Sequence, residues 1–320
     1  MSLPSDMNLA WADPALQRAA VALADGAPGQ ARDLLAATTD PDRRELYVSV
    51  LGDAGRHQLK ALRELASDAG DDPHALLLLG SALGFAAWAA RGAATMDHTA
   101  EDQVQGMLGF AAQSRTMLGR AAALAPDDPA PLVALMSVVK AAATDRHEPH
   151  RLFKQVDALA PDSFMGNQQR LSMLCRKWYG STEQMLGFTR ERVALLPDGH
   201  PLLSLVPQAH IEVWVDGWME GNFAGRIYRR FTYGPLKRAA VRDEVDRASD
   251  RMLAGAAAFA DHPWAMMAHQ MFGAYYAHAG AKAKARVHLE RGGDRASEWP
   301  WGYFGDASVE LQNARSAAGL

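Results

Sequence analysis

Three proline turns recur at nearly equal intervals along the middle of the chain. A Pro-Asp pair begins at Pro126, Pro161 and Pro197, so the intervals are 35 and 36 residues. Because proline lacks a backbone N–H and its ring clashes with the preceding turn, it ends a helix. A period close to this length is typical of antiparallel helix pairs that bury their apolar faces against one another in a row. The spacing therefore predicts an all-α fold arranged as a superhelical solenoid.

Aspartate directly before proline marks the expected start of several helices. Proline suits the first helical position, where its missing N–H would have no partner, and the preceding carboxylate can accept from the free N–H groups. Such starts are predicted at Asp13-Pro14, Asp40-Pro41, Asp72-Pro73 and Asp128-Pro129, with a variant at Asp261-His262-Pro263.

A degenerate repeat signature specifies the type of helix pair. Tetratricopeptide pairs place a small residue at the end of the first helix, another five residues later and a large apolar residue nine residues later. Gly26, Ala31 and Leu35 follow this pattern, and stretches beginning at Gly180 and Gly280 follow it more loosely. The sequence thus predicts tetratricopeptide-like pairs in a single helical-repeat domain over residues 1–320. Its expected parts are N-terminal helices at 1–70, core repeats at 71–290 and a C-terminal cap at 291–320.

Composition limits the classes of function. The hydrophobic share of 48% and the charged share of 22% are ordinary for a globular protein, and the net charge is −4. Nucleic-acid binding normally needs a basic balance, so we expect no nucleic-acid partner. The one cysteine, Cys175, cannot form an internal disulfide, which favours a reducing cytoplasm.

The most apolar stretch, Ala75 to Ala90, raises the question of a membrane span. As a helix its residues would rise about 24 Å, which is less than the hydrocarbon core of roughly 30 Å. We therefore predict a buried core helix and no membrane association. The first 14 residues lack a basic segment followed by an apolar one, so no secretory signal is expected.

Two stretches carry a resemblance to a known family. They are Ala87-Trp88-Ala89-Ala90-Arg91-Gly92 and Lys177-Trp178-Tyr179-Gly180-Ser181. They resemble the A-W-x-x-R-G and K-W-x-G-S stretches of a bacterial domain-of-unknown-function family built on tetratricopeptide-like helices, over roughly residues 70–290. The family often has glycine where this chain has Tyr179. The resemblance implies a helical-repeat fold and leaves function open.

The motif residues themselves are expected to be structural: Trp88, Arg91, Gly92, Lys177, Trp178, Gly180 and Ser181. Arg91 and Lys177 each stand beside a tryptophan at a helix end, where a cation can bond the last carbonyls or pack on the aromatic ring. Ser181 opens a Ser-Thr-Glu-Gln capping box for the following helix.

One candidate binding surface is an aromatic shelf in the concave groove. His210, Trp214 and Trp218 lie four residues apart, so they share one helix face. In helical-repeat proteins the first helices of the pairs line the groove in which ligands bind. The alternative is ordinary packing between adjacent pairs.

A second candidate is a basic stretch with interleaved aromatic residues. It contains Arg226, Tyr228, Arg229 and Arg230 and continues through Lys237, Arg238 and Arg242. Guanidinium groups bind carboxylates and phosphates through paired hydrogen bonds, so the stretch could hold an acidic partner. The alternative is a solvated face that pairs with acids elsewhere.

We find no catalytic signature, cofactor motif or metal site. His147 and His150 lack a third ligand, and Cys175 lies among leucines that suggest burial. The sequence therefore favours a non-catalytic cytoplasmic module that binds a protein or peptide partner in its concave groove. The alternative is a helical protein, such as an enzyme of a biosynthetic pathway, that binds a small molecule or anion through the Trp214/Trp218 and Arg226–Arg242 region.

Overall fold

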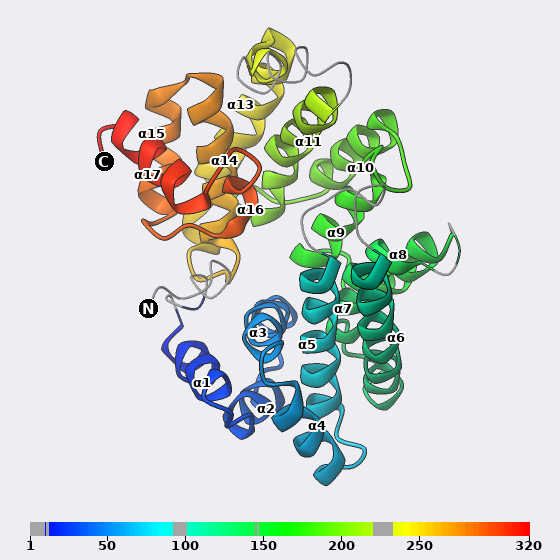
Figure 1. Ribbon diagram of the computed structural model, residues 1–320. Helices are drawn as coiled ribbons and strands as arrows, with labels where there is room; N and C mark the ends of the chain where they lie inside the picture. The colour runs from blue at the N-terminus through cyan, green and yellow to red at the C-terminus, as the bar shows by residue number, and fades with distance from the viewer. Residues whose placement is uncertain (1–9, 11–12, 92–100, 144, 146, 220–232) are drawn as a thin grey trace. The chain divides into compact units, whose positions relative to one another are not determined.

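The structure, a computed structural model, describes residues 10, 13–91, 101–143, 145, 147–219 and 233–320 (Figure 1). In these residues the secondary structure is helical and contains no β-strand, which confirms the predicted all-α class. The chain divides into two compact units, residues 1–170 and 171–320. The two units are described separately below, and the prediction of one continuous repeat domain stays a prediction.

The first unit consists of consecutive helices joined by short turns. They are α1 (Pro14–Ala24), α2 (Gly29–Ala37), α3 (Pro41–Gly55), α4 (Leu59–Asp68), α5 (Pro73–Arg91), α6 (Glu101–Leu124), α7 (Ala130–Ala142), α8 (Glu148–Leu159) and the beginning of α9 (Phe164–Leu174). Helices α1 and α2, α5 and α6, and α7 and α8 contact one another as sequence neighbours, and α3 also packs on α5 and α7.

The second unit begins with the end of α9, and short 3₁₀ turns connect several of its helices. Its elements are α10 (Thr182–Ala194), η3 (Pro201–Ser204), α11 (Leu205–Met219), η4 (Gly234–Lys237), α13 (Ala239–Ala254), η5 (Ala256–Phe259), α14 (Ala265–Ala279), α15 (Lys282–Arg291), α16 (Glu298–Trp301) and α17 (Ala307–Ala317). Helices α14 and α15 form a pair, against which α17 packs.

Four of the predicted helix starts are confirmed. Asp13 Oδ1 accepts from the backbone N–H groups of the second and third residues of α1, and Asp40 caps α3 in the same manner. Asp72 and Asp128 each accept from the N–H two residues further on, at α5 and α7. The fifth start differs, because α14 begins at Ala265 after a separate turn and not at Pro263.

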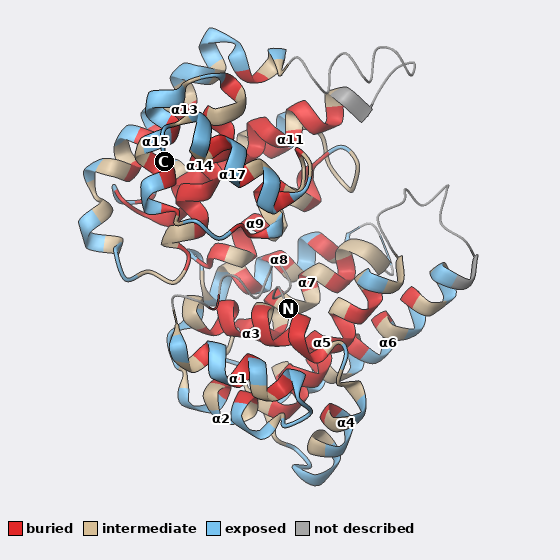
Figure 2. Cartoon of the chain, turned by 60° about the vertical axis from the view of Figure 1, so that its left-hand side comes forward, coloured by how far each residue is buried: buried red, intermediate tan, exposed pale blue. Residues whose placement is uncertain are grey.

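Helix α5 is the centre of the first unit. It is long and apolar enough for a membrane span by length and composition alone, but 61% of its apolar window is buried inside the protein. It contacts α3, α4, α6 and α7, and Figure 2 shows its buried length. Gly80 permits the close approach of α6, because a Cβ there would lie 2.7 Å from Cγ of Leu118. These contacts agree with the predicted core helix.

The core of the second unit is aromatic. The Trp214 ring of α11 stacks on Phe304 at 5.1 Å between centroids, and Phe304 stacks on His278 of α14 at 3.6 Å. Trp301 is fully buried and donates its ring N–H to Gln270 Oε1 at 3.0 Å. The C-terminal aromatic residues therefore pack back on α11 and α14, and their role as the cap of a solenoid stays a prediction.

Two glycines of the second unit bring separate backbones into direct contact. Gly199 adopts a positive φ of 88°, which disfavours side chains, and its N–H donates to the Arg251 carbonyl at 2.9 Å. A Cβ on Gly199 would lie 2.1 Å from the Gly255 oxygen, and one on Gly255 would lie 2.0 Å from the Asp198 oxygen. Only glycine fits at either position of this backbone crossing.

Candidate functional site

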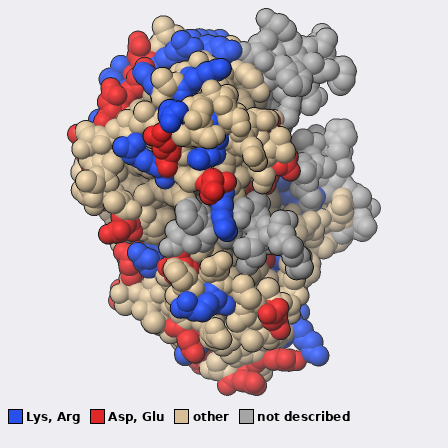
Figure 3. Space-filling model, turned by 90° about the vertical axis from the view of Figure 1, so that its left-hand side faces the viewer, with Lys and Arg blue, Asp and Glu red and all other residues tan. Residues whose placement is uncertain are grey.

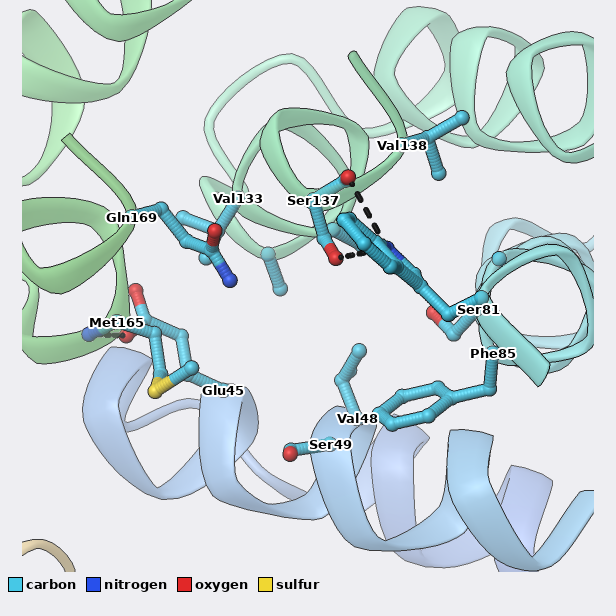
Figure 4. A pocket seen from close by; sticks show the side chains of 14 residues that line it. Glu45, Val48, Ser49, Ser81, Phe85, Val133, Ser137, Val138, Met165 and Gln169 are labelled. Carbon is cyan, nitrogen blue, oxygen red and sulfur yellow. Dashed lines mark hydrogen bonds between the residues drawn. The ribbon is translucent and has the colours of Figure 1, made fainter. Parts of the chain in front are cut away.

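A pocket that opens to solvent lies on alternate helices of the first unit (Figure 4). Most of its surface is apolar, and a few polar groups are placed around it. Side chains from four helices line it: Glu45 and Val48 of α3, Ser81, Phe85 and Trp88 of α5, Val133 and Ser137 of α7, and Met165 and Gln169 of α9. Largely apolar concave sites with a few fixed polar groups are typical of ligand pockets.

The most perturbed group of the pocket is the carboxyl of Glu45. Glu45 lies in a nearly continuous run of buried residues on α3 and is only 3% exposed. Burial raises the pKa of this carboxyl to about 8, from an ordinary value of 4.5, and the nearby Asp42 carboxylate adds to the rise. The group is therefore mostly protonated at neutral pH.

Glu45 also positions helix α9, whose first N–H groups need acceptors. Asp42 accepts from the N–H of Phe164, Glu45 Oε2 accepts from the N–H of Met165, and Ser163 Oγ accepts from the N–H of Gly166, all at 2.9–3.0 Å. A further hydrogen bond of 2.6 Å joins Ser163 Oγ to Glu45 Oε1. Three successive donors at the start of α9 are thus satisfied by side chains, which fixes one wall of the pocket.

Two other polar atoms of the pocket are buried without a hydrogen-bond partner among the described residues. They are Ser81 Oγ on α5 and Gln169 Oε1 on α9. An unsatisfied buried polar atom costs about 1–3 kcal/mol, so such atoms are rare in folded proteins unless a ligand or water completes them. Each of the two atoms is therefore a separate point on the pocket wall at which a polar group of a ligand or a water would be stabilised.

Trp88, which the sequence assigns to structure, forms another wall of the pocket. Its ring N–H donates to the Ser137 carbonyl at 3.2 Å and to Ser137 Oγ at 3.0 Å, which ties α5 to α7 (Figure 4). Arg91 lies over the ring at 5.3 Å from the centroid, and Lys140 lies at 5.2 Å. The expected cation–aromatic packing of Arg91 is therefore present, while Gly92 lies outside the described residues.

The predicted aromatic shelf is buried where it is described. Trp214 is 1% exposed and packs on Phe304. His210 is 6% exposed, and its Nε2 lies 3.1 Å from Glu244 Oε2. These two residues therefore do not form an exposed surface, because α11 turns them towards α13 and the C-terminal aromatic residues.

The rest of the predicted binding residues lie outside what the structure describes. The side chain of Trp218 is not described, and neither are Arg226, Tyr228, Arg229 and Arg230. Their binding role stays a prediction. Three later cations of the same basic stretch are described and exposed: Lys237, Arg238 and Arg242.

The K-W-x-G-S stretch has a clear structural role. Lys177 Nζ forms an ion pair with Glu212 Oε2 at 2.6 Å, a contact that its position at a helix end does not predict. Gly180 is required because a Cβ there would lie 2.4 Å from the Leu174 carbonyl oxygen. Ser181 Oγ accepts from the Gln184 N–H at 3.2 Å, which confirms the predicted cap of α10.

The ion pair belongs to a larger polar cluster in the second unit. Tyr303 donates its hydroxyl to Glu212 Oε1 at 2.5 Å, and the Lys177 ammonium lies 5.1 Å from the centre of the Tyr303 ring. Burial raises the pKa of the Tyr303 hydroxyl, and the Glu212 charge adds to the rise. Burial also raises the pKa of Asp216, whose Oδ2 has no partner among the described residues. Trp178, the remaining residue of the K-W-x-G-S stretch, directly follows Lys177 in the sequence.

A second buried cluster contains residue types that occur in hydrolases. Ser249 Oγ lies 2.8 Å from His288 Nε2, and His288 Nδ1 lies 2.9 Å from His269 Nδ1. Burial lowers the pKa of His288 to about 2 and that of His269 to about 4. All three side chains are buried, so a substrate cannot contact Ser249 without opening the core. We assign this cluster to packing.

Metal ligands do not gather in the described part of the chain: no three His, Cys, Asp or Glu side chains lie close enough to hold an ion. Cys175 is buried, as its leucine neighbours predict. No protein-family model matches the chain, and neither a curated protein nor a solved structure matches it. The resemblance to the bacterial repeat family therefore stays a prediction.

The sequence patterns do not single out Glu45, Ser81 or Gln169. Glu45 ends the charged run Asp42-Arg43-Arg44-Glu45, so its local sequence resembles an exposed helix start. Its burial, and its place in one pocket with Gln169, depend on how α3, α5 and α9 pack.

Proposed function

We propose that this chain is a binding protein whose first unit receives an apolar group of a protein or peptide partner in the Glu45 pocket. The helices that line the pocket alternate in sequence as α3, α5, α7 and α9, with α4, α6 and α8 between them. In solenoids of antiparallel pairs, one helix of each pair faces the inner groove. The alternation supports both the tetratricopeptide-like solenoid and the use of its inner face for binding.

The pocket favours an apolar group over an anion. Val48, Phe85, Val133 and Met165 supply apolar surface, and the lining contains the Glu45 carboxyl without any Lys or Arg side chain. On the face drawn in Figure 3, acidic and basic side chains of the described residues are interspersed. An anionic partner therefore finds no complementary charge in this pocket, and anion binding is left to the basic stretch after Arg226.

A small molecule in the same pocket is the second candidate. The observation that favours it is that two buried polar atoms without partners among the described residues, Ser81 Oγ and Gln169 Oε1, belong to residues that line this pocket. A small molecule would fill the pocket alone, whereas a partner segment would also contact the surface around its opening. We place either form of binding in the cytoplasm, because the composition and the lone cysteine favour it.

Selection from a displayed peptide library against the full chain tests the proposal. Ala134 lines the pocket on α7, so Ala134→Phe should fill part of it, while Ala112→Phe on the exposed face of α6 serves as a matched control. We expect enriched peptides that share one side chain with a long or large hydrocarbon part, bound by the wild type and the control and bound at least tenfold less by Ala134→Phe. Peptides that bind all three proteins equally would exclude the pocket as the partner site.

A further inference from the structure

Glu45 is a buried acid without a basic partner among the described residues. The adjacent Arg44 does not serve it, because the Arg44 guanidinium pairs with Asp128 at 2.7 Å and lies 3.1 Å from the His74 ring nitrogen. The acids Asp42 and Asp128 both raise the pKa of Glu45 and so disfavour its ionisation. Since buried carboxylates in proteins are normally paired with a cation, the pocket lacks a complementary positive charge.

The carboxyl has hydrogen-bonding capacity left for such a charge. Its two oxygens offer about four acceptor positions when ionised, and the structure uses one on each oxygen, for Ser163 and Met165. Glu45 thus anchors α9 and still has acceptor positions free. Gln169 Oε1 is a further acceptor of the same pocket and has no donor among the described residues, whereas Ser81 lies beside Gly52, about two helical turns along α3 from Glu45. An ammonium group carries three donors, enough for the free positions of Glu45 and for Gln169.

The remaining lining suits a hydrocarbon chain. Val48, Phe85 and Val133 offer apolar surface, and the Trp88 ring closes one side of the pocket. The cations that lie over Trp88, Arg91 and Lys140, are not among the lining residues. A ligand with an apolar body and a positively charged end therefore fits both parts of the pocket.

We propose that the Glu45 pocket binds a primary ammonium group carried on an apolar chain, the chemistry of a lysine side chain in a partner segment. The ammonium pairs with the Glu45 carboxylate and donates to Gln169, and the methylenes contact Val48 and Phe85. The inference rests on the proposed function and specifies the chemistry of its partner. Glu45 gives up its proton when the cation binds, because an adjacent positive charge stabilises the carboxylate.

Isothermal titration calorimetry on the full chain distinguishes charge recognition from simple apolar burial. The probes are 4-phenylbutylamine, 4-phenylbutanol and 4-phenylbutanoate, which share one hydrocarbon body and differ at the end group. We expect the amine to bind at least tenfold more tightly than the alcohol, and the carboxylate to bind more weakly than either. Glu45→Gln should abolish the preference for the amine, while Glu64→Gln at an exposed site of α4 should retain it.

A second measurement on the wild type alone does not depend on a variant folding. Titration of the amine at pH 7 in two buffers of different ionisation enthalpy should show release of about one proton per amine bound, as linkage to Glu45 requires. Equal affinities for amine and alcohol, both lost in Ala134→Phe, would overturn the charge recognition and leave the proposed pocket function standing. Absence of amine binding or of proton release would also overturn the proposed recognition of an ammonium group. The peptide selection would then be the remaining test of the proposed function.

Discussion

Replacing Glu45 with glutamine should make the protein more stable at neutral and alkaline pH. Glutamine has nearly the same shape, and its amide can retain the hydrogen bonds to Ser163 and to the Met165 N–H. The substitution removes the free-energy cost of keeping the Glu45 carboxyl protonated, or of burying its charge, in an apolar pocket. The fold should therefore be preserved while the pH dependence of stability changes.

The size of the effect follows from the two pKa values of Glu45. The folded protein holds the proton up to a pKa of about 8, and the unfolded chain releases it near 4.5. Because the folded pKa is the higher one, the stabilisation is complete below pH 4.5 and is lost as pH rises towards 8. At about 1.4 kcal/mol per pH unit, the free energy of unfolding of the wild type falls by about 3 kcal/mol by pH 7 and by about 5 kcal/mol above pH 8, relative to the variant.

Urea denaturation followed by circular dichroism at pH 5, 7 and 9 measures this difference. Other titrating groups, including the buried histidines, are common to both proteins and cancel in the comparison. Hydrogen exchange of the α3 and α9 amides assigns the change to the first unit. The two proteins should have similar stability at pH 5 and diverge as pH rises. Parallel stability curves over the whole range would refute the reasoning, since they would mean that Glu45 titrates as an ordinary carboxyl.

Two further substitutions test the packing of the second unit. Gly180→Ala should destabilise the protein by about 2 kcal/mol or more in thermal unfolding, because its Cβ would overlap a backbone carbonyl. The control Gly119→Ala has open space around it in α6, so it should be neutral or stabilising by about 0.5–1 kcal/mol. Equal effects would contradict the close contact at Gly180. Trp214→Ala should cost about 3–5 kcal/mol by denaturant unfolding, as for a core residue, and a loss below about 0.5 kcal/mol would instead indicate an exposed shelf.

Helix boundaries were predictable where they depend on neighbouring residues. Asp40 caps α3 and Ser181 caps α10 through bonds to N–H groups three residues away, so the sequence pattern contains both partners. The Pro126, Pro161 and Pro197 turns likewise separate helices, since each proline follows a helix end at Leu124, Leu159 or Ala194. Local chemistry accounts for these features.

The candidate site was not predictable because its contacts join distant segments. Glu45 meets Ser163 across 118 residues of sequence, and neither residue type indicates the other. Helix periodicity placed Trp214 on a face with His210 but could not show that this face is covered by Phe304, which lies much further along the chain. Periodicity identifies a face of a helix, and the tertiary packing decides what covers it.

The crossing of Gly199 and Gly255 restricts how the second unit can diverge in evolution. At each glycine the backbone of the opposite segment occupies the space that a Cβ would need, so a change at one position cannot be compensated by a change at its counterpart. A protein that carries side chains at both aligned positions must route its chain differently between α10 and the end of α13. The pair thus offers a simple criterion for recognising distant sequences that share this corner.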